Sequence, residues 1–198
     1  MRRAFLLICL LLLATAGPAR SAPPKPRPLA GNGILTIRCI PAKTAVDQLP
    51  LHLYREPGIG RIGELDPLDL PQLSPALKCA ANSFLAVVTR KKGDWVKVIY
   101  DEGGREGWLE MARHWRYESW GSYLRGREVR MLPGLRKELT QLRSSPDLHA
   151  PALGALSSRS SLRVVEVSGS WILVLVDLTD SGWIKWRDDD GRFLVSCE

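Results

Sequence analysis

The sequence contains little of what catalytic and metal-binding sites are usually built from. Its 198 residues include four cysteines and three histidines. No two cysteines have the C-x-x-C spacing of a zinc site, and the histidines lie far apart in the sequence. We therefore expect no metal site, no cofactor and no cysteine–histidine pair of the kind that a nucleophilic hydrolase needs.

Long apolar runs are also scarce. The clearest run, residues 5–13, is too short to span a bilayer; it follows Arg2 and Arg3 and precedes small residues up to Ser21. This pattern is typical of a secretory signal peptide, here residues 1–21, rather than of a membrane anchor. We expect an exported protein, in the periplasm or outside the cell, with no membrane span after signal cleavage.

Positive charge is present but is not concentrated in one place. Arg2, Arg3 and Arg20 lie in the predicted signal, so a net charge of +7 becomes +4 after cleavage. Most other Lys and Arg residues have acidic neighbours, which favours a solvated surface; weak attraction to an anionic cell-wall polymer is the alternative. Export and the lack of a basic–aromatic motif argue against nucleic acid as a partner.

Two stretches of the chain resemble each other. GDWVKVIYDEGGREGWLE (93–110) and GSWILVLVDLTDSGWIKW (169–186) both begin Gly-x-Trp, continue with alternating aliphatic residues and resume at Gly-Trp. Upstream of them, matching blocks keep the same order: 84–95 with 161–171, 62–65 with 153–156, 53–57 with 142–146, and 37–41 with 129–133. Ordered matches of this kind indicate an internal repeat.

The repeat sets the predicted organisation of the mature chain. We expect a Pro-rich solvated tether (22–33), a first module (34–110), an aromatic linker (111–126) and a second module with a C-terminal hairpin (127–198). The spacing between matching blocks changes between Leu65 and Phe84, so the first module carries an insertion at about 66–83. We predict that this insertion is a long loop held down by its leucines.

The segments within each module are typical of β-strands. They are short, alternating and β-branched, and turn signals such as KKGD and VSGS separate them. This pattern predicts an all-β fold of small barrels or sandwiches. Leu173 and Leu175 lie on the opposite strand face from Ile172 and Val174, so both faces should be covered. The aromatic linker, as a short helix or an ordered turn, is the predicted cover.

Three cysteines remain after signal cleavage: Cys39, Cys79 and Cys197. An oxidising compartment favours a disulfide between two of them. We predict the pair Cys39–Cys79, because both residues belong to the first module, although Cys197 could replace either one.

Each copy resembles the bacterial SH3 (SH3b) domain. The motif of that family is L-x-x-R-x-x-P, then G-x-L, a hydrophobic strand, G-x-W-x-x-V and a closing G-W-hydrophobic. QLRSSPDLHAPALGAL, SLRVVEVSGSWILVLV and SGWIKW fit it in the second copy; HLYREPGIGRIGEL, FLAVVTRKKGDWVKVIY and EGWLEM fit it in the first. The resemblance covers roughly 37–186 and implies two small SH3-like β-barrels in tandem, joined by a short linker that could be helical. The insertion, the leading strands and the residues after Trp186 depart from the pattern.

The resemblance also implies a binding or targeting module of the cell envelope, with peptidoglycan, a wall peptide or an envelope protein as its partner. Carried over to this chain, the groove residues would be Tyr54, Arg55, Glu56, Trp95 and Trp108 in the first copy, and Arg143, Ser144, Asp147, Trp171 and Trp183 in the second. The tryptophans could equally belong to the barrel framework.

Three classes of function were therefore weighed. Non-catalytic binding to the cell envelope is the prediction, and a periplasmic interaction or scaffold protein without a wall ligand is the alternative. Exposure of Leu173 and Leu175 would favour that alternative. An enzyme is disfavoured because the repeat leaves no room for a catalytic domain, and the acidic run 188–190 has the composition of a turn. The oligomeric state is left open.

Overall fold

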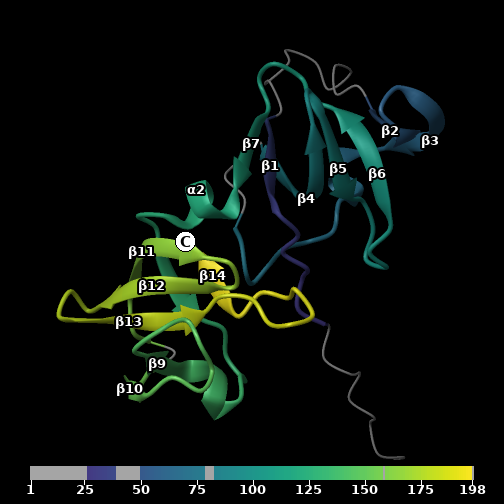
Figure 1. The fold of residues 1–198 in the computed structure, drawn as a ribbon. Helices are drawn as coiled ribbons and strands as arrows, with labels where there is room; N and C mark the ends of the chain where they lie inside the picture. Colours follow the sequence, from purple (N-terminus) through teal and green to yellow (C-terminus); the bar gives the residue numbers. More distant parts are fainter. Residues whose placement is uncertain (1–25, 39–49, 79–82, 158, 198) are drawn as a thin grey trace, which may run out of the picture.

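The protein is described here by a computed structural model that covers residues 26–38, 50–78, 83–157 and 159–197. Its described part is mostly β-structure, arranged as two antiparallel seven-stranded sheets with one short helix between them (Figure 1). The expectation of an all-β protein is confirmed at this level. The predicted signal peptide lies outside the described residues.

The first sheet contains the strands β1 to β7 in the order β3-β2-β6-β5-β4-β1-β7. Their bounds are β1 Gly33–Arg38, β2 Leu51–Glu56, β3 Ile59–Leu65, β4 Ser83–Lys92, β5 Trp95–Ile99, β6 Glu106–Glu110 and β7 Arg116–Ser119. A short 3-10 turn, η1 (Pro67–Asp69), lies in the insertion between β3 and β4.

The second sheet contains β8 to β14 in the order β10-β9-β13-β12-β11-β8-β14. Their bounds are β8 Glu128–Met131, β9 Gln141–Arg143, β10 Ala152–Ala155, β11 Leu162–Ser168, β12 Trp171–Val176, β13 Asp180–Lys185 and β14 Val195–Cys197, with a 3-10 turn, η2, at Lys137–Thr140. The two orders agree strand for strand, and the matching blocks of the sequence fall on equivalent strands. The internal repeat is therefore visible in the strand pairing.

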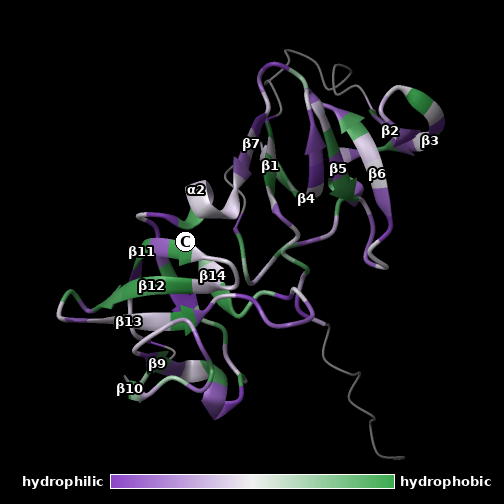
Figure 2. Ribbon diagram, viewed as in Figure 1, coloured by the Kyte–Doolittle hydropathy of each residue, from purple (hydrophilic) through white to green (hydrophobic). Residues whose placement is uncertain are grey.

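The alternating sequences bury one face of each strand. In β5, Val96 and Val98 are fully buried, and Ile172 and Val174 are their fully buried equivalents in β12. Figure 2 shows that β12 is hydrophobic along most of its length, as a strand shielded on both faces would be. Leu173 and Leu175 on the other face are half-buried, so the predicted cover of that face is present only in part.

β-Bulges occur at equivalent places in the two sheets. The register shifts at Thr89 in β4 and at Val165 in β11, and again at Ile62 in β3 and at Leu153 in β10. A bulged residue is unpaired and its strand twists locally. Three of the bulged residues, Ile62, Leu153 and Val165, carry large apolar side chains that are exposed.

The described part of the predicted tether is not solvated. Residues 26–32, which we call the strap, run along the C-terminal turn of the second sheet. Ala30 is fully buried and its N–H donates to Gly191 O at 2.8 Å, while Pro28 O accepts from Phe193 N–H at 3.2 Å. The prediction failed because a Pro-rich segment with few strand signals can still be held by backbone groups of a distant turn.

The predicted linker, 111–126, contains structure belonging to both halves. Its middle forms β7, which pairs with β1, and Trp120–Leu124 form the short helix α2. The Ser119 hydroxyl caps this helix by accepting from Ser122 N–H at 3.4 Å. Of the two forms predicted for the linker, a short helix or an ordered turn, the helix is present. It packs against β7, β1 and β11 rather than over the outer face of β12.

Two hydrophobic cores result. One belongs to the first sheet alone and includes Leu35, Val88 and Leu109. The other fills the second sheet and continues through α2 into Ile34 and Val87 of the first. The two halves are thus joined by a continuous apolar core.

Trp120 is the centre of that junction. Its ring lies 5.4 Å from the Trp186 ring and 5.1 Å from the Phe193 ring, and its Nε1–H donates to Ala30 O at 2.7 Å. A buried tryptophan needs such a partner for its N–H, and here the strap supplies it.

The insertion and the C-terminus meet beside this core. Leu70, Leu73 and Leu77 are buried, as expected of a loop held down by its leucines. The predicted C-terminal hairpin is limited to a tight turn closed by the bridge between Arg187 and Phe193. The chain then leaves that turn, and β14 pairs with β8 instead of extending the hairpin.

Candidate functional site

The predicted site residues of the first half lie on three adjacent strands. Tyr54 on β2 is opposite Trp108 on β6, and Trp108 is opposite Lys97 on β5. Side chains of directly opposed residues project from the same face of a sheet. We call Tyr54, Trp95, Lys97 and Trp108 the aromatic face.

Tyr54 and Trp95 form the part of this face that a ligand can reach. Their ring centroids are 5.3 Å apart with an interplanar angle of 88°, an edge-to-face contact. Both rings are half-buried, so each is fixed by packing while still offering surface to solvent. Trp108, in contrast, is buried, and it serves the framework.

Arg55 and Glu56 lie exposed where β2 ends, beside the tight turn into β3. At Gly58 of this turn φ is +72°, and an added Cβ would lie 3.8 Å from the Trp95 ring. Glycine adopts this left-handed conformation without steric cost and lets the turn approach Trp95 closely. The turn thereby places one positive and one negative side chain at the border of the aromatic face.

A second charged pair crosses the same face. Lys97 Nζ lies 2.9 Å from Glu106 Oε2, and both side chains are partly shielded from solvent. Burial alone would raise the pKa of Glu106, but hydrogen bonds from Lys97 and Thr89 and the charges of Lys97 and Arg90 outweigh it and lower the pKa. Glu106 is therefore ionised at neutral pH. The sequence analysis did not identify this ion pair.

The second half uses the equivalent positions differently. Arg143 occupies the place of Tyr54 and is opposite Trp183 on β13. Its side chain is buried, with Nη1 donating to Ala150 O at 2.7 Å and Nη2 donating to Gln141 Oε1 at 2.8 Å. Within the described residues, its Nε has no hydrogen-bond partner. This guanidinium holds the loop after β9 and is turned away from solvent.

The other predicted residues of the second half lie in an exposed loop or at half-buried strand positions. Ser144 and Asp147 are exposed in the loop after β9, where Asp147 Oδ1 accepts from His149 N–H at 2.7 Å and stabilises the turn. Trp171 and Trp183 are half-buried, and Trp171 is opposite Lys185. Lys185 is itself buried and pairs with Asp189 at 2.6 Å. By their register, Trp171 and Trp183 project from the same face as Arg143, but among the described residues no ring contact joins them as one joins Tyr54 and Trp95.

Two residues expected to separate the function classes give an intermediate answer. Leu173 and Leu175 are half-buried, not exposed. A larger apolar exposure occurs in the first half, where Ile59 at the start of β3 is 71% exposed next to the turn that borders Trp95. The sequence analysis did not single out Ile59, because an isolated isoleucine after a Pro-Gly turn has no pattern that marks it as exposed.

The predicted disulfide involves Cys39 and Cys79, which lie outside the described residues, so it stays a prediction. Cys197 is described: it is buried, and its backbone N–H donates to Ala76 O at 2.8 Å. Ala76 is three residues before Cys79 in the sequence. The alternative in which Cys197 pairs with Cys79 therefore stays open.

Across the described segments, no group of three His, Cys, Asp or Glu residues is arranged to hold a metal ion. Nor does any helix in those segments have the length and apolarity needed to cross a membrane. A comparison of the sequence with models of known protein families and with curated proteins finds no match.

Proposed function

We propose that this chain is a non-catalytic binding protein of the cell envelope, made of two SH3-like β-barrel modules in tandem. The aromatic face of the first half is its binding surface. The observation that carries the proposal is the Tyr54–Trp95 pair, which is held rigidly by edge-to-face packing and is left half-exposed between charged side chains.

The fold assignment is supported by the strand order. The same order of seven strands occurs twice, and the blocks that resemble the SH3b motif lie on equivalent strands of both sheets. In each half the L-x-x-R-like strand pairs with the Gly-Trp strand, β2 with β6 and β9 with β13. One small β-module, duplicated, explains both the sequence repeat and this pairing.

The chemistry of the aromatic face suits peptidoglycan or a wall peptide. Aromatic rings offer broad apolar surface with few rotatable bonds, so little side-chain entropy is lost on binding. Sugar rings and aliphatic side chains can pack on Tyr54 and Trp95. Arg55, Lys97 and the neighbouring carboxylates can pair with the carboxylates and amines of short peptides.

The carboxylates whose pKa values shift are held ionised, which suits partners of cations and does not suit a general acid. A hydrogen bond from Arg105 lowers the pKa of Asp101, and the pKa of Glu106 is lowered as described above. A general acid at neutral pH needs a raised pKa. Both groups instead stay ionised as partners of cations.

Export to the periplasm or the cell exterior belongs to the same proposal. It rests on the pattern of residues 1–21, and a mildly basic mature chain is compatible with an anionic wall.

One observation favours a second candidate, an interaction with an envelope protein. Ile59 is largely exposed beside the aromatic face and would extend it into a surface for a protein partner.

The proposal is tested by co-sedimentation of the mature chain, residues 22–198, with purified peptidoglycan sacculi at low and high salt. We expect retention that persists at high salt, because packing on aromatic rings is not screened by ions. Tyr54→Ala should abolish it. Retention that disappears in high salt would reduce the interaction to charge attraction, and no retention at either salt would contradict wall binding and favour the protein partner.

A further inference from the structure

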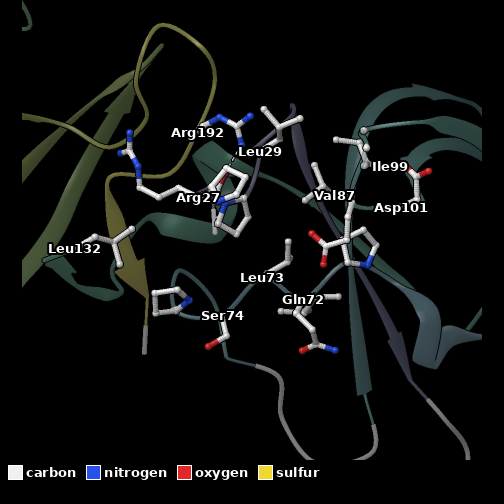
Figure 3. A pocket seen from close by; sticks show the side chains of 18 of the residues that line it. Arg27, Leu29, Gln72, Leu73, Ser74, Val87, Ile99, Asp101, Leu132 and Arg192 are labelled. Carbon is white, nitrogen blue, oxygen red and sulfur yellow. Dashed lines mark hydrogen bonds between the residues drawn. The ribbon is translucent and has the colours of Figure 1, made fainter. Parts of the chain in front are cut away.

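A groove of about 290 Å³ lies between the two halves, and although Ile99 of β5 lines it, no residue of the aromatic face does. Three segments surround it: the strap, the insertion around Gln72 and Ser74, and the turn between β5 and β6 (Figure 3). Its volume is at the small end of the range for ligand pockets, roughly 300–1,000 Å³. The groove can therefore hold one or two residues of a peptide, not a folded partner.

The floor of the groove is apolar. Leu29, Leu73, Val87, Ile99 and Leu132 line it, contributed by both halves of the molecule. Prolines of the strap and of the insertion form much of the rim, and fixed backbone dihedrals make such walls stiff. A preformed apolar site loses little conformational entropy when an aliphatic side chain enters.

The rim of the groove carries charges of both signs. Arg27 and Arg192 lie on one side of the groove, and Asp101 lies on another (Figure 3), where Glu102 also lines it. Asp101 is already engaged, because Oδ1 accepts from Arg105 N–H at 2.7 Å and Oδ2 pairs with Arg105 Nε. It is therefore a poor anchor for a ligand amine.

Arg27 and Arg192 differ in how many of their N–H donors are already used within the protein. Arg27 is occupied, with Nη2 on Asp188 at 2.7 Å and Nη1 on Phe193 O at 3.0 Å. Arg192 donates Nη1 to Arg27 O, and within the described chain its Nε and Nη2 donate to no protein group. Arg192 can thus receive a carboxylate at the mouth of the groove.

Two neutral side chains complete the rim. The Gln72 amide and the Ser74 hydroxyl are exposed, and neither forms a hydrogen bond to another described residue. An amide both donates and accepts, which matches a peptide group. In Figure 3 they lie on the opposite side of the apolar floor from Arg192.

We infer that this groove is a second binding site, which takes the C-terminal end of a short peptide with an aliphatic last residue. The side chain lies on the apolar floor, the free carboxylate pairs with Arg192, and the chain before the last residue runs toward Gln72 and Ser74. The site does not depend on the function proposed for the aromatic face, since the two share no residue.

The test uses the mature chain with two probes, acetyl-Ala-Leu with a free carboxylate and the same peptide with a C-terminal amide. Methyl NMR spectra are recorded during titration to millimolar concentration. We expect the methyl signals of Leu73, Val87 and Ile99 to shift, and the free acid to bind about threefold to fivefold more tightly than the amide, as for a partly exposed ion pair.

Variants separate recognition from loss of structure. Arg192→Gln should remove the preference for the free acid, and Gln72→Ala should weaken both probes alike. Arg113→Gln, an exposed arginine outside the groove, is the matched control and should change nothing. Tyr54→Ala should also leave this binding unchanged, so failure of the aromatic face as a wall site would not be confused with failure here.

Several results would overturn the inference. Equal affinity for acid and amide, or shifts confined to residues outside the groove, would exclude carboxylate recognition at Arg192. A further comparison uses a chain that starts at Pro26. If its groove methyl signals differ from those of the mature chain, and neither peptide binds to the mature chain, then residues 22–25 of the chain itself occupy the groove.

Discussion

The two halves of the molecule pair their strands in the same order, yet the same position carries opposite roles in them. Tyr54 in the first half packs against Trp95 and leaves part of its ring in solvent. Arg143 in the second half is buried and donates to Ala150 O and Gln141 Oε1. The comparison shows that a duplicated β-module can keep its strand pairing while the residue at one position is half-exposed in one half and buried as internal support in the other.

The cores differ in a related way. The first sheet has a core of its own, whereas the core of the second sheet continues through α2 into the first. Trp120, Trp186 and Phe193 form the aromatic centre of that shared core. The first half is therefore the more self-contained unit, and the second depends on the junction.

The largest effect is expected at the junction. Trp120→Ala should lower the free energy of unfolding by about 3–5 kcal/mol, because it empties a buried site shared by both halves. Urea unfolding followed by tryptophan fluorescence and by circular dichroism measures it, and we expect the two probes to separate as the halves uncouple. Trp115→Ala, at a half-buried position, is the control and should cost less. If Trp120→Ala lowered the free energy of unfolding no more than Trp115→Ala does, the result would contradict a core shared by the two halves.

Arg143 and Tyr54 should respond in opposite ways. Arg143→Ala should cost about 1–3 kcal/mol, because Ala150 O and Gln141 lose their partner in a buried setting, and it should leave retention on sacculi intact. Tyr54→Ala should cost less stability and abolish retention. Chemical denaturation and co-sedimentation on the same samples measure both quantities. Loss of retention in the Arg143 variant at a temperature where it is folded would remove the functional difference between the halves.

The strap should have a smaller effect. Arg27→Ala removes the ion pair with Asp188 and the bond to Phe193 O, and about 1 kcal/mol of stability should be lost. For a chain of this size, that corresponds to a fall in Tm of about 2–4 °C. Differential scanning calorimetry measures the change, with Arg113→Ala as the exposed control. A Tm that stays the same as in the control would mean that the strap does not stabilise the second half.

The smallest effect concerns Glu106. Its pKa is lowered in the folded protein, so its pairing stabilises the fold above the ordinary glutamate pKa of about 4.3 and is lost as pH falls through the folded pKa. Glu106→Gln should therefore cost less than about 1 kcal/mol at neutral pH and nothing in strong acid. Denaturation curves from pH 7 down to acid compare the two proteins. If the difference in free energy of unfolding between the two proteins grew toward low pH, it would contradict the lowered pKa of Glu106.

Much of the fold could be predicted from the sequence, because alternation and Gly-Trp pairs are local signals. The equivalence of Trp95 with Trp171 and the short helix at Trp120 both came from such patterns. The docking of Ala30 on Gly191 could not be predicted, since it joins backbone groups that are 161 residues apart and leaves no trace in composition. For the same reason, the groove between the halves had no sequence signal.

The candidate site was predicted in part. Tyr54 and Trp95 were named from the SH3b resemblance, and the structure brings their rings together. Arg143 was named on the same grounds, but its burial depends on how the loop to Ala150 closes, which the residue pattern does not specify. Because resemblance identifies equivalent positions and not their exposure, it named both halves as binding surfaces.

The central claim is that the first half alone carries the binding face, and it is tested most directly by a matched pair of substitutions. Trp95 and Trp171 are equivalent in the repeat, begin equivalent strands and are both half-buried. Retention of each variant on sacculi at high salt is the measurement. The account predicts that Trp95→Ala loses retention while Trp171→Ala, with a similar loss of stability, keeps it. Equal loss in both variants, or loss in Trp171→Ala alone, would contradict the claim.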